Sequence, residues 1–573
     1  MTTTSSSDAR MSTSVKGMTA IVDYAVGSHA RAAIVLIAVS LVAFLPGFFA
    51  LPPIDRDEAR FAQATKQMIE SGDYIDIRFQ DEVRYKKPVG IYWLQAAVVN
   101  AAELVAGPQA RTTIWLYRIP SLIGAVTSVL LCYWAALAFV SRRAAVLAAM
   151  MLATSILLGV EARLAKTDAC LLATVIAAMG ALGRVYQAAR GEGHARPTWQ
   201  LPAIFWTALA VGMLLKGPLI IAFVVLTAGS LSLLDRSGRW LLALRPLPGI
   251  AWFCLLALPW FIAIVLRSGD SFLTQSVGQD MLAKVFSSQE AHGAPPGFYF
   301  ALFWVTFWPG ATLAAMAAPS VWAARNEPGA RFLLCWLIPS WIMFEAVMTK
   351  LPHYVLPLYP AVAIMIAGII DPHVLARERW LVRGTGWWFI LAVILAVTAI
   401  VGNMVLGKQL GLLAWPFAAG AIILGLFAWR LYEADGPELS LLRAMASSIL
   451  IAVSLYSLIA PSIAALFPSV ALAEAVRESG CKQPLAAAAG YHEPSMVFLV
   501  GTSIQLTDGA GAAEFLRQGP CRFAFVESRQ ERSFAQRADA VGLRYAPGPR
   551  IEGINISIGR PITIAVYQSN EQP

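Results

Sequence analysis

Long apolar runs dominate this 573-residue sequence and limit what it can fold into. A helix needs about 20 apolar residues to cross the hydrocarbon core of a bilayer, and about thirteen runs approach or exceed this length. They lie near 31–51, 112–140, 144–160, 167–187, 200–215, 217–234, 246–266, 298–323, 332–349, 352–370, 386–406, 411–430 and 444–467. We therefore expect an all-α polytopic membrane protein with about 13 transmembrane helices.

The overall composition agrees with a lipid environment. Hydrophobic residues make up 58% of the chain and charged residues only 14%, against about 25% charged residues in soluble domains. The formal net charge of +9 could indicate a nucleic-acid partner. The basic residues, however, lie in short connections between apolar runs, where they determine topology. We therefore expect no nucleic-acid partner.

The basic connections predict the orientation of the chain. With a cytoplasmic N-terminus, every second connection carries Arg, as the positive-inside rule requires. These connections contain Arg142 and Arg143; Arg184, Arg190 and Arg196; Arg236, Arg239 and Arg245; Arg325 and Arg331; Arg377, Arg379 and Arg383; Arg430 and Arg443. Residues 1–30 are rich in Ser and Thr and lack a cleavage motif, so we expect a disordered cytoplasmic tail. An odd number of spans places residues 468–573 on the outer face.

The expected domains follow from this topology. Residues 31–467 form the membrane domain, with outer loops at 52–111 and 267–297, and residues 468–573 form a small soluble α/β domain. Within the first loop, 89–105 is typical of a helix lying at the membrane interface. The expected elements of the last domain are helices at 471–480 and 510–518 and strands at 495–500, 522–526 and 563–568.

The last domain also contains two cysteines, Cys481 and Cys521. An oxidising outer compartment would permit a disulfide between them. The sequence leaves this pairing open, because disulfide geometry cannot be read from spacing.

Charged residues near the outer membrane boundary form four clusters. Such groups are energetically costly at this boundary, and they usually have a function. The clusters are Asp55, Asp57 and Glu58; Arg84, Lys86 and Lys87; Glu161, Arg163, Lys166 and Asp168; Lys350, His353 and Tyr354. Together they could bind a phosphate through cations and use a carboxylate as a base. The alternative is a set of ordinary interfacial charges. We interpret Lys216 as a snorkelling lysine beside a tight turn, and Asp280 and Lys284 as loop charges that could lean over the site.

Several of these motifs resemble a known family. The stretches Asp57-Glu58-Ala59-Arg60-Phe61-Ala62, Ser71-Gly72-Asp73-Tyr74 and Tyr85-Lys86-Lys87-Pro88 are similar to the first periplasmic loop of the bacterial aminoarabinose transferases. Three later stretches also fit: 163–168, Leu215-Lys216-Gly217-Pro218 and 350–357. These enzymes belong, with the protein O-mannosyltransferases, to the GT-C superfamily of lipid-linked-sugar glycosyltransferases. The resemblance covers about residues 30–370 and extends to the layout of the soluble tail.

The resemblance implies transfer of a sugar from a polyprenyl-phosphate donor to a periplasmic acceptor, with inversion at the anomeric carbon. By position, Asp57 and Asp168 match the family's two essential acids, and Lys87 matches the lysine that holds the donor phosphate, with Tyr354 beside it. Further residues are assigned by their place in the same motifs. Arg60 and Lys86 are candidates for phosphate binding, and Glu58, Tyr85, Arg163, Asp280, Lys350 and His353 are other site candidates.

At two positions this chain departs from the metal-binding motifs of the family that it resembles. Relatives often have Glu or Asp before the loop lysine, where a metal ligand has been placed, but this chain has Lys86. In the second loop, Gln279-Asp280 stands where many relatives have Glu-His. No His, Cys and carboxylate spacing of a structural metal site occurs. A divalent metal remains possible, and our hypothesis is that Lys86 supplies the charge that a metal would bring.

The preferred function is therefore a glycosyltransferase of the bacterial inner membrane that modifies lipid A or the lipopolysaccharide core. We expect a monomer with a cytoplasmic N-terminus and a periplasmic C-terminal domain, in contact with membrane lipid. One alternative is a protein O-glycosyltransferase that uses the same kind of donor. A secondary transporter is a second alternative, although the chain lacks obvious repeats and paired broken helices. A scaffold without catalytic activity is a third.

Overall fold

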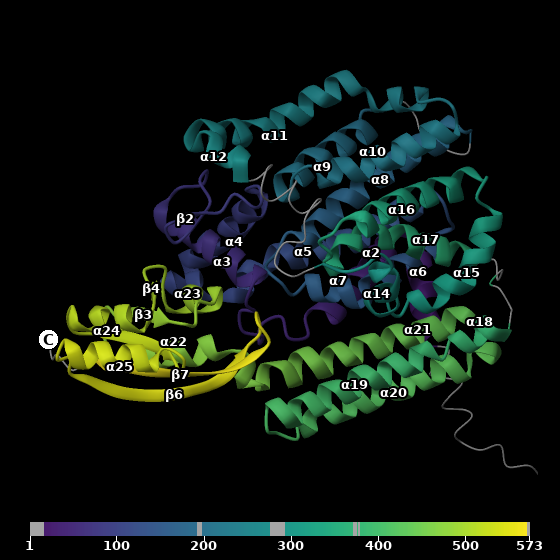
Figure 1. The fold of residues 1–573 in the computed structure, drawn as a ribbon. Coiled ribbons are helices and arrows are strands. Elements are labelled where there is room, and N and C mark those ends of the chain that lie inside the picture. Colours follow the sequence, from purple (N-terminus) through teal and green to yellow (C-terminus); the bar gives the residue numbers. More distant parts are fainter. Residues whose placement is uncertain (1–16, 192–197, 276–292, 371–374, 376–378, 570–573) are drawn as a thin grey trace, which may run out of the picture.

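The computed structural model describes residues 17–191, 198–275, 293–370, 375 and 379–569. Helices make up most of this part of the chain, and a small mixed sheet follows them near the C-terminus (Figure 1). The predicted fold class, a helical membrane protein with a small C-terminal sheet domain, is confirmed. Most of the second outer loop, including Asp280 and Lys284, lies outside the described residues.

Seven stretches of helix are long and apolar enough to cross a membrane among the residues that the structure describes. The helices in them are α5 (Ile114–Ala136), α8 (Asp168–Ala189), α11 (Pro246–Ser268), η4 with α17 (Pro352–Leu358 and Tyr359–Ile370), α18 with α19 (Arg379–Gly384 and Trp387–Leu406), η5 with α20 (Leu412–Ala414 and Trp415–Arg430), and α21 (Tyr432–Ala452) with the short turns after it. An eighth span results if α14 (Phe298–Thr306) and α15 (Ala311–Ala323), which meet at a bend of 118°, are counted as one. The number of 13 spans therefore stays a prediction.

Shorter helices fill the remaining apolar runs and two of the connections between runs. They are α2 (His29–Phe44), α6 (Arg142–Ala153), α7 (Ile156–Glu161), α9 (Gln200–Lys216), α10 (Leu219–Leu234), η2 (Arg239–Leu244), α12 (Asp270–Leu273), α14 (Phe298–Thr306), α15 (Ala311–Ala323) and α16 (Pro328–Ala346). Helix α8 lies at the centre of the bundle, packed against α5 and α9. Small residues permit this close packing. A Cβ added to Gly124 of α5 would lie 2.8 Å from the backbone nitrogen of Cys170 in α8.

The first outer loop is folded rather than extended. It contains α3 (Asp57–Ser71), the short strands β1 (Arg78–Phe79) and β2 (Glu82–Val83), α4 (Gly90–Ala106) and the turn η1 (Gly107–Thr112). Helix α3 ends at Gly72, which has a φ of 70° that suits glycine. Residues 89–105, expected as a helix at the membrane interface, are helical from Gly90 onward as α4, whose last turn exposes the apolar side chains of Leu104 and Val105.

The C-terminal region combines a five-stranded sheet with four helices. Its elements are α22 (Pro468–Glu478), β3 (Leu485–Ala489), α23 (Pro494–Val500), β4 (Gln505–Thr507), α24 (Gly509–Arg517), β5 (Arg522–Glu527), α25 (Glu531–Ala540), β6 (Tyr545–Asn555) and β7 (Arg560–Ser569). The strand order is β4-β3-β5-β7-β6, with β3 parallel to β4 and β5 and the other pairs antiparallel.

Two expectations about local structure are wrong. Residues 495–500 form a helix instead of a strand, because Pro494 begins a helical turn and a short apolar run has no period that separates the two states. Gly17–Val26, within the expected disordered tail, is also helical. Its side chains Val22 and Ala25 are fully buried, which explains the order.

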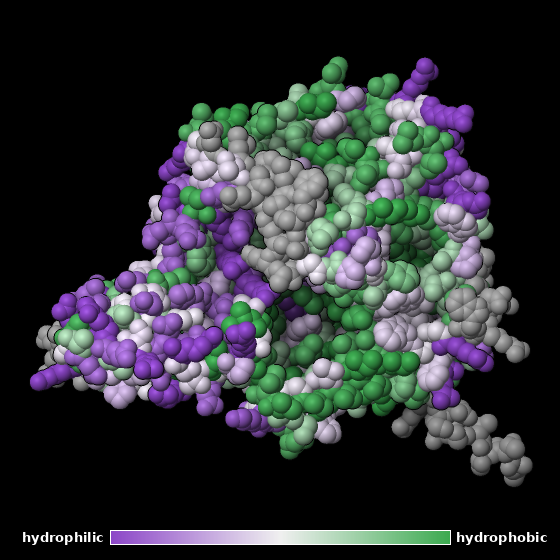
Figure 2. All heavy atoms as spheres, viewed as in Figure 1, coloured by the Kyte–Doolittle hydropathy of each residue, from purple (hydrophilic) through white to green (hydrophobic). Residues whose placement is uncertain are grey.

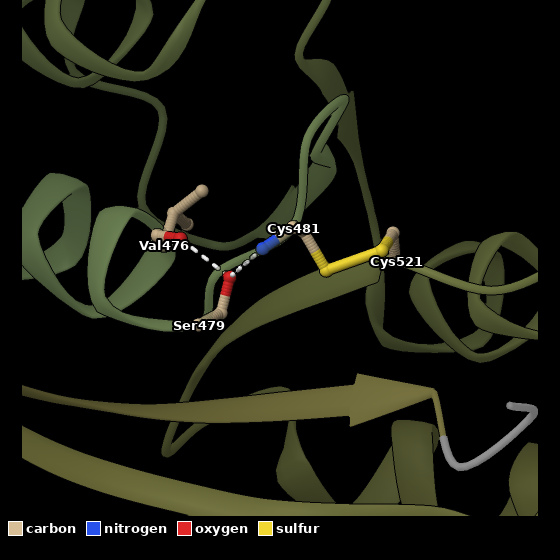
Figure 3. Close-up of a disulfide and its surroundings, with 4 residues drawn as sticks. All are labelled: Val476, Ser479, Cys481 and Cys521. Carbon is tan, nitrogen blue, oxygen red and sulfur yellow. Dashed lines mark hydrogen bonds between the residues drawn. A yellow bond between two sulfur atoms is a disulfide. The ribbon is translucent and has the colours of Figure 1, made fainter. Parts of the chain in front are cut away.

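The structure pairs Cys481 with Cys521, the bond that the sequence left open (Figure 3). Their Cα atoms lie 5.8 Å apart, within the range for disulfides. The bond joins the segments that precede β3 and β5, two adjacent parallel strands, so it stabilises the start of this strand pair.

The C-terminal region lies directly against the first outer loop (Figure 1). Lys66 donates to the carbonyl of Phe498 at 3.0 Å, and Gln80 donates to the carbonyl of Ile504 at 2.7 Å. Figure 2 shows hydrophilic side chains gathered over this part of the molecule and an apolar surface over the helices. The junction of these two regions contains the candidate site.

Candidate active site

A cavity of about 390 Å³ opens where the first loop, the ends of several helices and the C-terminal region meet. It is strongly charged, with six lysine or arginine side chains and three carboxylates. The lining residues are Arg56, Asp57, Arg60, Phe61, Arg84, Lys86, Lys87, Thr167, Asp168, Lys216, Thr349, Leu351, His353, Tyr354, His492, Glu493, Pro494 and Ser557.

The first loop supplies one carboxylate and most of the cations. Asp57 begins α3, where an acidic side chain is favoured by the helix dipole. Arg60 follows three residues later, so it lies on the same side of the helix. Lys86 and Lys87 come from the segment between β2 and α4. The first loop therefore provides a proton acceptor, Asp57, and a cluster of positive charge. The positive charge suits an anionic ligand.

The second carboxylate is Asp168, the first residue of α8, which is only 5% exposed. Lys216, the last residue of α9, donates to Asp168 Oδ1. Lys166 Nζ lies 3.7 Å from Asp168 Oδ2, and His353 Nε2 lies 3.8 Å from Asp168 Oδ1. Two ammonium groups thus compensate a carboxylate that would otherwise be costly to bury.

Tyr354 and His353 line the cavity from η4, which is far from α3 and α8 in the sequence. Lys216 Nζ lies 5.3 Å from the centre of the Tyr354 ring, a cation–π distance. His353 packs edge-on against Tyr354, with ring centres 5.0 Å apart. The ring of Tyr354 therefore holds the lysine that binds Asp168.

One group of side chains has the composition of a metal site. Ligand atoms of Glu161, Asp168 and His353 all lie within 4.8 Å of one another. However, Lys166 Nζ lies 3.1 Å from Glu161 Oε1, and Lys216 already binds Asp168. A divalent cation would lie beside two ammonium groups, which repel it. The residues present, including Lys86 in place of an acidic ligand, do not fit a resident metal.

The structure brings together seven of the twelve site candidates that were assigned from the motifs. Asp57, Arg60, Lys86, Lys87, Asp168, His353 and Tyr354 all line the one cavity.

Other candidates lie outside this lining and have structural contacts. Tyr85 is buried and donates to Asp76 Oδ1 at 2.7 Å. Lys350 is buried and donates to the carbonyl of Val347 at 2.7 Å. Glu58 forms an ion pair with Arg118. Asp280 falls outside the described residues.

Arg163 also belongs to a different environment. Its guanidinium donates to the carbonyls of Ala43, Pro46 and Gly159, and it lies 4.4 Å from the ring centre of Tyr456. It thereby ties the segment before α8 to the end of α2.

Sequence reasoning missed Arg56 and two further contributions to the cavity. It interpreted Lys216 as a snorkelling lysine, because its partner Asp168 is 48 residues away and only the fold brings them together. It also assigned no role to the C-terminal region, which provides His492, Glu493, Pro494 and Ser557. The short polar stretch Tyr491-His492-Glu493 between two apolar segments was the only available signal.

Comparison with known proteins agrees with this arrangement. Residues 56–270 match the model of the dolichyl-phosphate-mannose-protein mannosyltransferase family. An undecaprenyl phosphate-alpha-4-amino-4-deoxy-L-arabinose arabinosyl transferase of Pectobacterium carotovorum is 26% identical over 407 residues, 70% of this chain and 67% of the relative. An enzyme of the same name from Erwinia tasmaniensis is 28% identical over 54% of each chain. The chain thus aligns with about half to two thirds of these relatives.

A solved structure shows the same fold over nearly the whole chain. ArnT from Cupriavidus metallidurans bound to undecaprenyl phosphate superposes with a TM-score of 0.70 at 17% identity, covering 93% of this chain and 97% of the other. The apo state of that protein also has a TM-score of 0.70, at 18% identity. The chain therefore has the GT-C fold, and it resembles the bacterial aminoarabinose transferases and the protein mannosyltransferases.

Proposed function

We propose that this protein transfers a sugar from a polyprenyl-phosphate donor to an acceptor at the outer face of the bacterial inner membrane. The observation that carries this proposal is the single cavity in which Asp57 and Asp168 face a cluster of lysine and arginine side chains. The relatives named for an undecaprenyl-phosphate-linked sugar support the lipid donor.

In this proposal the cations hold the phosphate of the donor. Lys86, Lys87 and Arg60 line the cavity together. Their positive charge would stabilise the phosphate as the bond between the anomeric carbon and the phosphate oxygen breaks. Polyprenyl phosphate leaves with the electron pair of that bond, and an acceptor oxygen forms the new bond from the opposite face, so the anomeric centre inverts.

The two carboxylates have different roles. Asp57 orients the acceptor hydroxyl and accepts its proton as the new bond forms. Asp168 binds Lys216, so it acts through charge and position rather than as a free base. Where the acceptor is an ionised phosphate, no proton needs to be removed, and Asp57 only orients the acceptor.

The cavity has a feature that suits an amino sugar. Glu493 is the one carboxylate that the C-terminal region contributes to the described lining, and its Oε2 accepts a hydrogen bond from Ser557 at 2.7 Å. A carboxylate beside a cation-rich phosphate site would attract an ammonium group on the sugar. This supports an aminopentose donor like that of the named relatives.

The preferred acceptor is lipid A or the lipopolysaccharide core. Protein O-glycosylation is the main alternative, and the match of residues 56–270 to the protein mannosyltransferase family favours it. Transport is disfavoured because the charged side chains converge on one cavity at a single end of the helices, whereas alternating access needs a site near the midplane.

The proposed orientation has structural support. Asp23 in the N-terminal segment pairs with Arg143 at 2.6 Å, and Glu438 pairs with Arg143 at 2.5 Å. Arg331 and Arg190 both bind Asp235. The N-terminal segment and the basic connections therefore lie at common ends of the helices, which the positive-inside rule makes cytoplasmic. The disulfide fits an oxidising periplasm on the other side.

Transfer of label tests the proposal. Purified protein and its Asp57→Asn variant are incubated with radiolabelled polyprenyl-phosphate sugars and cell-envelope material. We expect label in lipid A or core sugar with the wild type only. Label in protein would favour the O-glycosyltransferase, and equal transfer by the variant would remove Asp57 as the catalytic acid. No transfer by the wild type from any donor would overturn the proposed function.

A further inference from the structure

Glu58 and Arg118 form a buried ion pair directly behind the candidate site. Glu58 follows Asp57 in α3, and Arg118 lies in α5. Arg118 is 0% exposed and Glu58 is 2% exposed. Arg118 Nε lies 2.8 Å from Glu58 Oε1, and Arg118 Nη2 lies 2.9 Å from Glu58 Oε2, a two-point contact.

The remaining hydrogen bonds of Arg118 fix the end of the first span. Its Nη1 donates to the carbonyls of Phe48 and Leu51, at 3.0 and 2.8 Å, and its Nη2 donates to the carbonyl of Pro52 at 3.0 Å. With the two bonds to Glu58, all five N–H groups of the guanidinium have acceptors. The chain therefore enters the first loop along one fixed path.

Glu58 also connects two segments that are distant in sequence. Its Oε2 accepts a hydrogen bond from the amide of Ile54, and its Oε1 accepts one from the amide of Ala165, each at 2.9 Å. Ala165 lies three residues before Asp168, and Glu58 lies one residue after Asp57. One buried carboxylate thus holds the backbone next to both cavity carboxylates.

We propose that Glu58 and Arg118 are positioning residues that set the relative placement of Asp57 and Asp168. This inference rests on the proposed function, because it assigns the pair a role in that reaction. Neither residue lines the cavity, so the pair acts through the backbone that it binds. An acceptor displaced by about 1 Å from its reacting partner costs about a hundredfold in rate.

The main alternative is a pair that only stabilises the fold. A single substitution would leave one buried charge without its partner and would destabilise the protein for that reason alone. The informative variant is Glu58→Met with Arg118→Met, which removes both charges and keeps similar volume. Arg143→Met with Glu438→Met is the matched control, since it removes a two-point Arg–Glu pair that joins α6 to α21 away from the cavity.

Two measurements on purified full-length protein test the role. The first is the transfer rate at saturating donor, normalised to the number of sites that bind undecaprenyl phosphate. The second is hydrogen exchange of the peptide that contains Ala165. For the Glu58/Arg118 variant we expect a rate at least about tenfold lower, a donor KM within about twofold of wild type because the phosphate-binding cations remain, and faster exchange at Ala165. We expect neither change in the control.

A normalised rate equal to that of the wild type would overturn the inference while leaving the proposed function in place. Unchanged exchange at Ala165 would also overturn it, since the amide would then not depend on Glu58. An inactive wild type with every donor would overturn the proposed function itself, and the inference with it. Equal loss of rate in the control would show a general effect of stability and would count against the pair.

Discussion

Lys216 and Asp168 form an ion pair between the last residue of α9 and the first residue of α8. The ammonium group also lies over the ring of Tyr354. Three segments, distant in sequence, therefore meet at one carboxylate. Because Asp168 is buried, its negative charge depends on this lysine and on Lys166.

The first prediction concerns this ion pair. Lys216→Met should lower the rate of transfer at saturating donor about a hundredfold, since an oriented charge next to the reacting atoms is lost. The Lys216→Arg variant keeps the positive charge and should therefore retain part of the transfer rate. Lys408→Met, which changes an exposed lysine outside the cavity lining, is the control. Initial rates with labelled donor measure the effect, and a Lys216→Met variant as fast as the control would contradict it.

The second prediction concerns the metal. If Lys86 supplies the charge that a metal would bring, chelators should leave the transfer rate unchanged, and Lys86→Ala should weaken donor binding about tenfold. Elemental analysis of purified protein accompanies the rate measurement. Stoichiometric zinc or manganese, with activity lost on chelation, would show that a cation binds despite the lysines.

Sequence reasoning predicts the features that follow from local patterns, namely the helices in apolar runs and the site residues in short motifs. Every predicted apolar run contains a helix, because a run of this length has no other stable form in lipid. Motif position identified Asp57, Lys87, Asp168 and Tyr354, which line one cavity.

Contacts between distant segments escaped prediction. Asp57 and Glu58 are neighbours in sequence, yet they point about 100° apart around the helix. One lines the cavity and the other binds Arg118. Nothing local distinguishes them, since the partner that buries Glu58 lies 60 residues away. The position of Glu493 also escaped prediction, because only the docking of the C-terminal region brings this residue to the cavity.

The third prediction is a pH dependence. Burial raises the pKa of Asp55 to about 6, although a hydrogen bond from Ser495 opposes this. Unfolded Asp has a pKa of about 4, so between pH 4 and 6 the folded state binds more protons than the unfolded state. The contribution of Asp55 to stability is therefore greatest below pH 4 and falls as the pH rises to 6. The loss amounts to about 3 kcal/mol.

Asp55→Asn tests this dependence, because it mimics the protonated side chain and keeps an acceptor for the Ser495 amide. The apparent Tm of the variant should exceed that of the wild type at pH 8 and match it at pH 4. A variant that is less stable than the wild type at pH 8 would show that the ionised carboxylate stabilises the junction instead.

The fourth prediction concerns the disulfide. Cys481 and Cys521 are 40 residues apart, so replacing both with Ser should destabilise the C-terminal region by about 3–4 kcal/mol through the entropy of the unfolded chain. Protease resistance of this region measures the loss, with and without a reductant. Cys254→Ser is the control, since Cys254 is a free cysteine in α11. Equal resistance of the reduced and oxidised protein would contradict the prediction.

The last prediction concerns the choice of sugar. Glu493 lines the cavity from the C-terminal region, where its carboxylate would pair with an ammonium group on the donor. Glu493→Gln keeps the hydrogen bond with Ser557 but removes the charge. Transfer from a 4-amino sugar should fall about tenfold, whereas transfer from the matching 4-hydroxy sugar should stay the same. Glu514→Gln, in α24 and paired with Arg537, is the control. An equal fall with both donors would mean that Glu493 supports the shape of the cavity and does not recognise the amine.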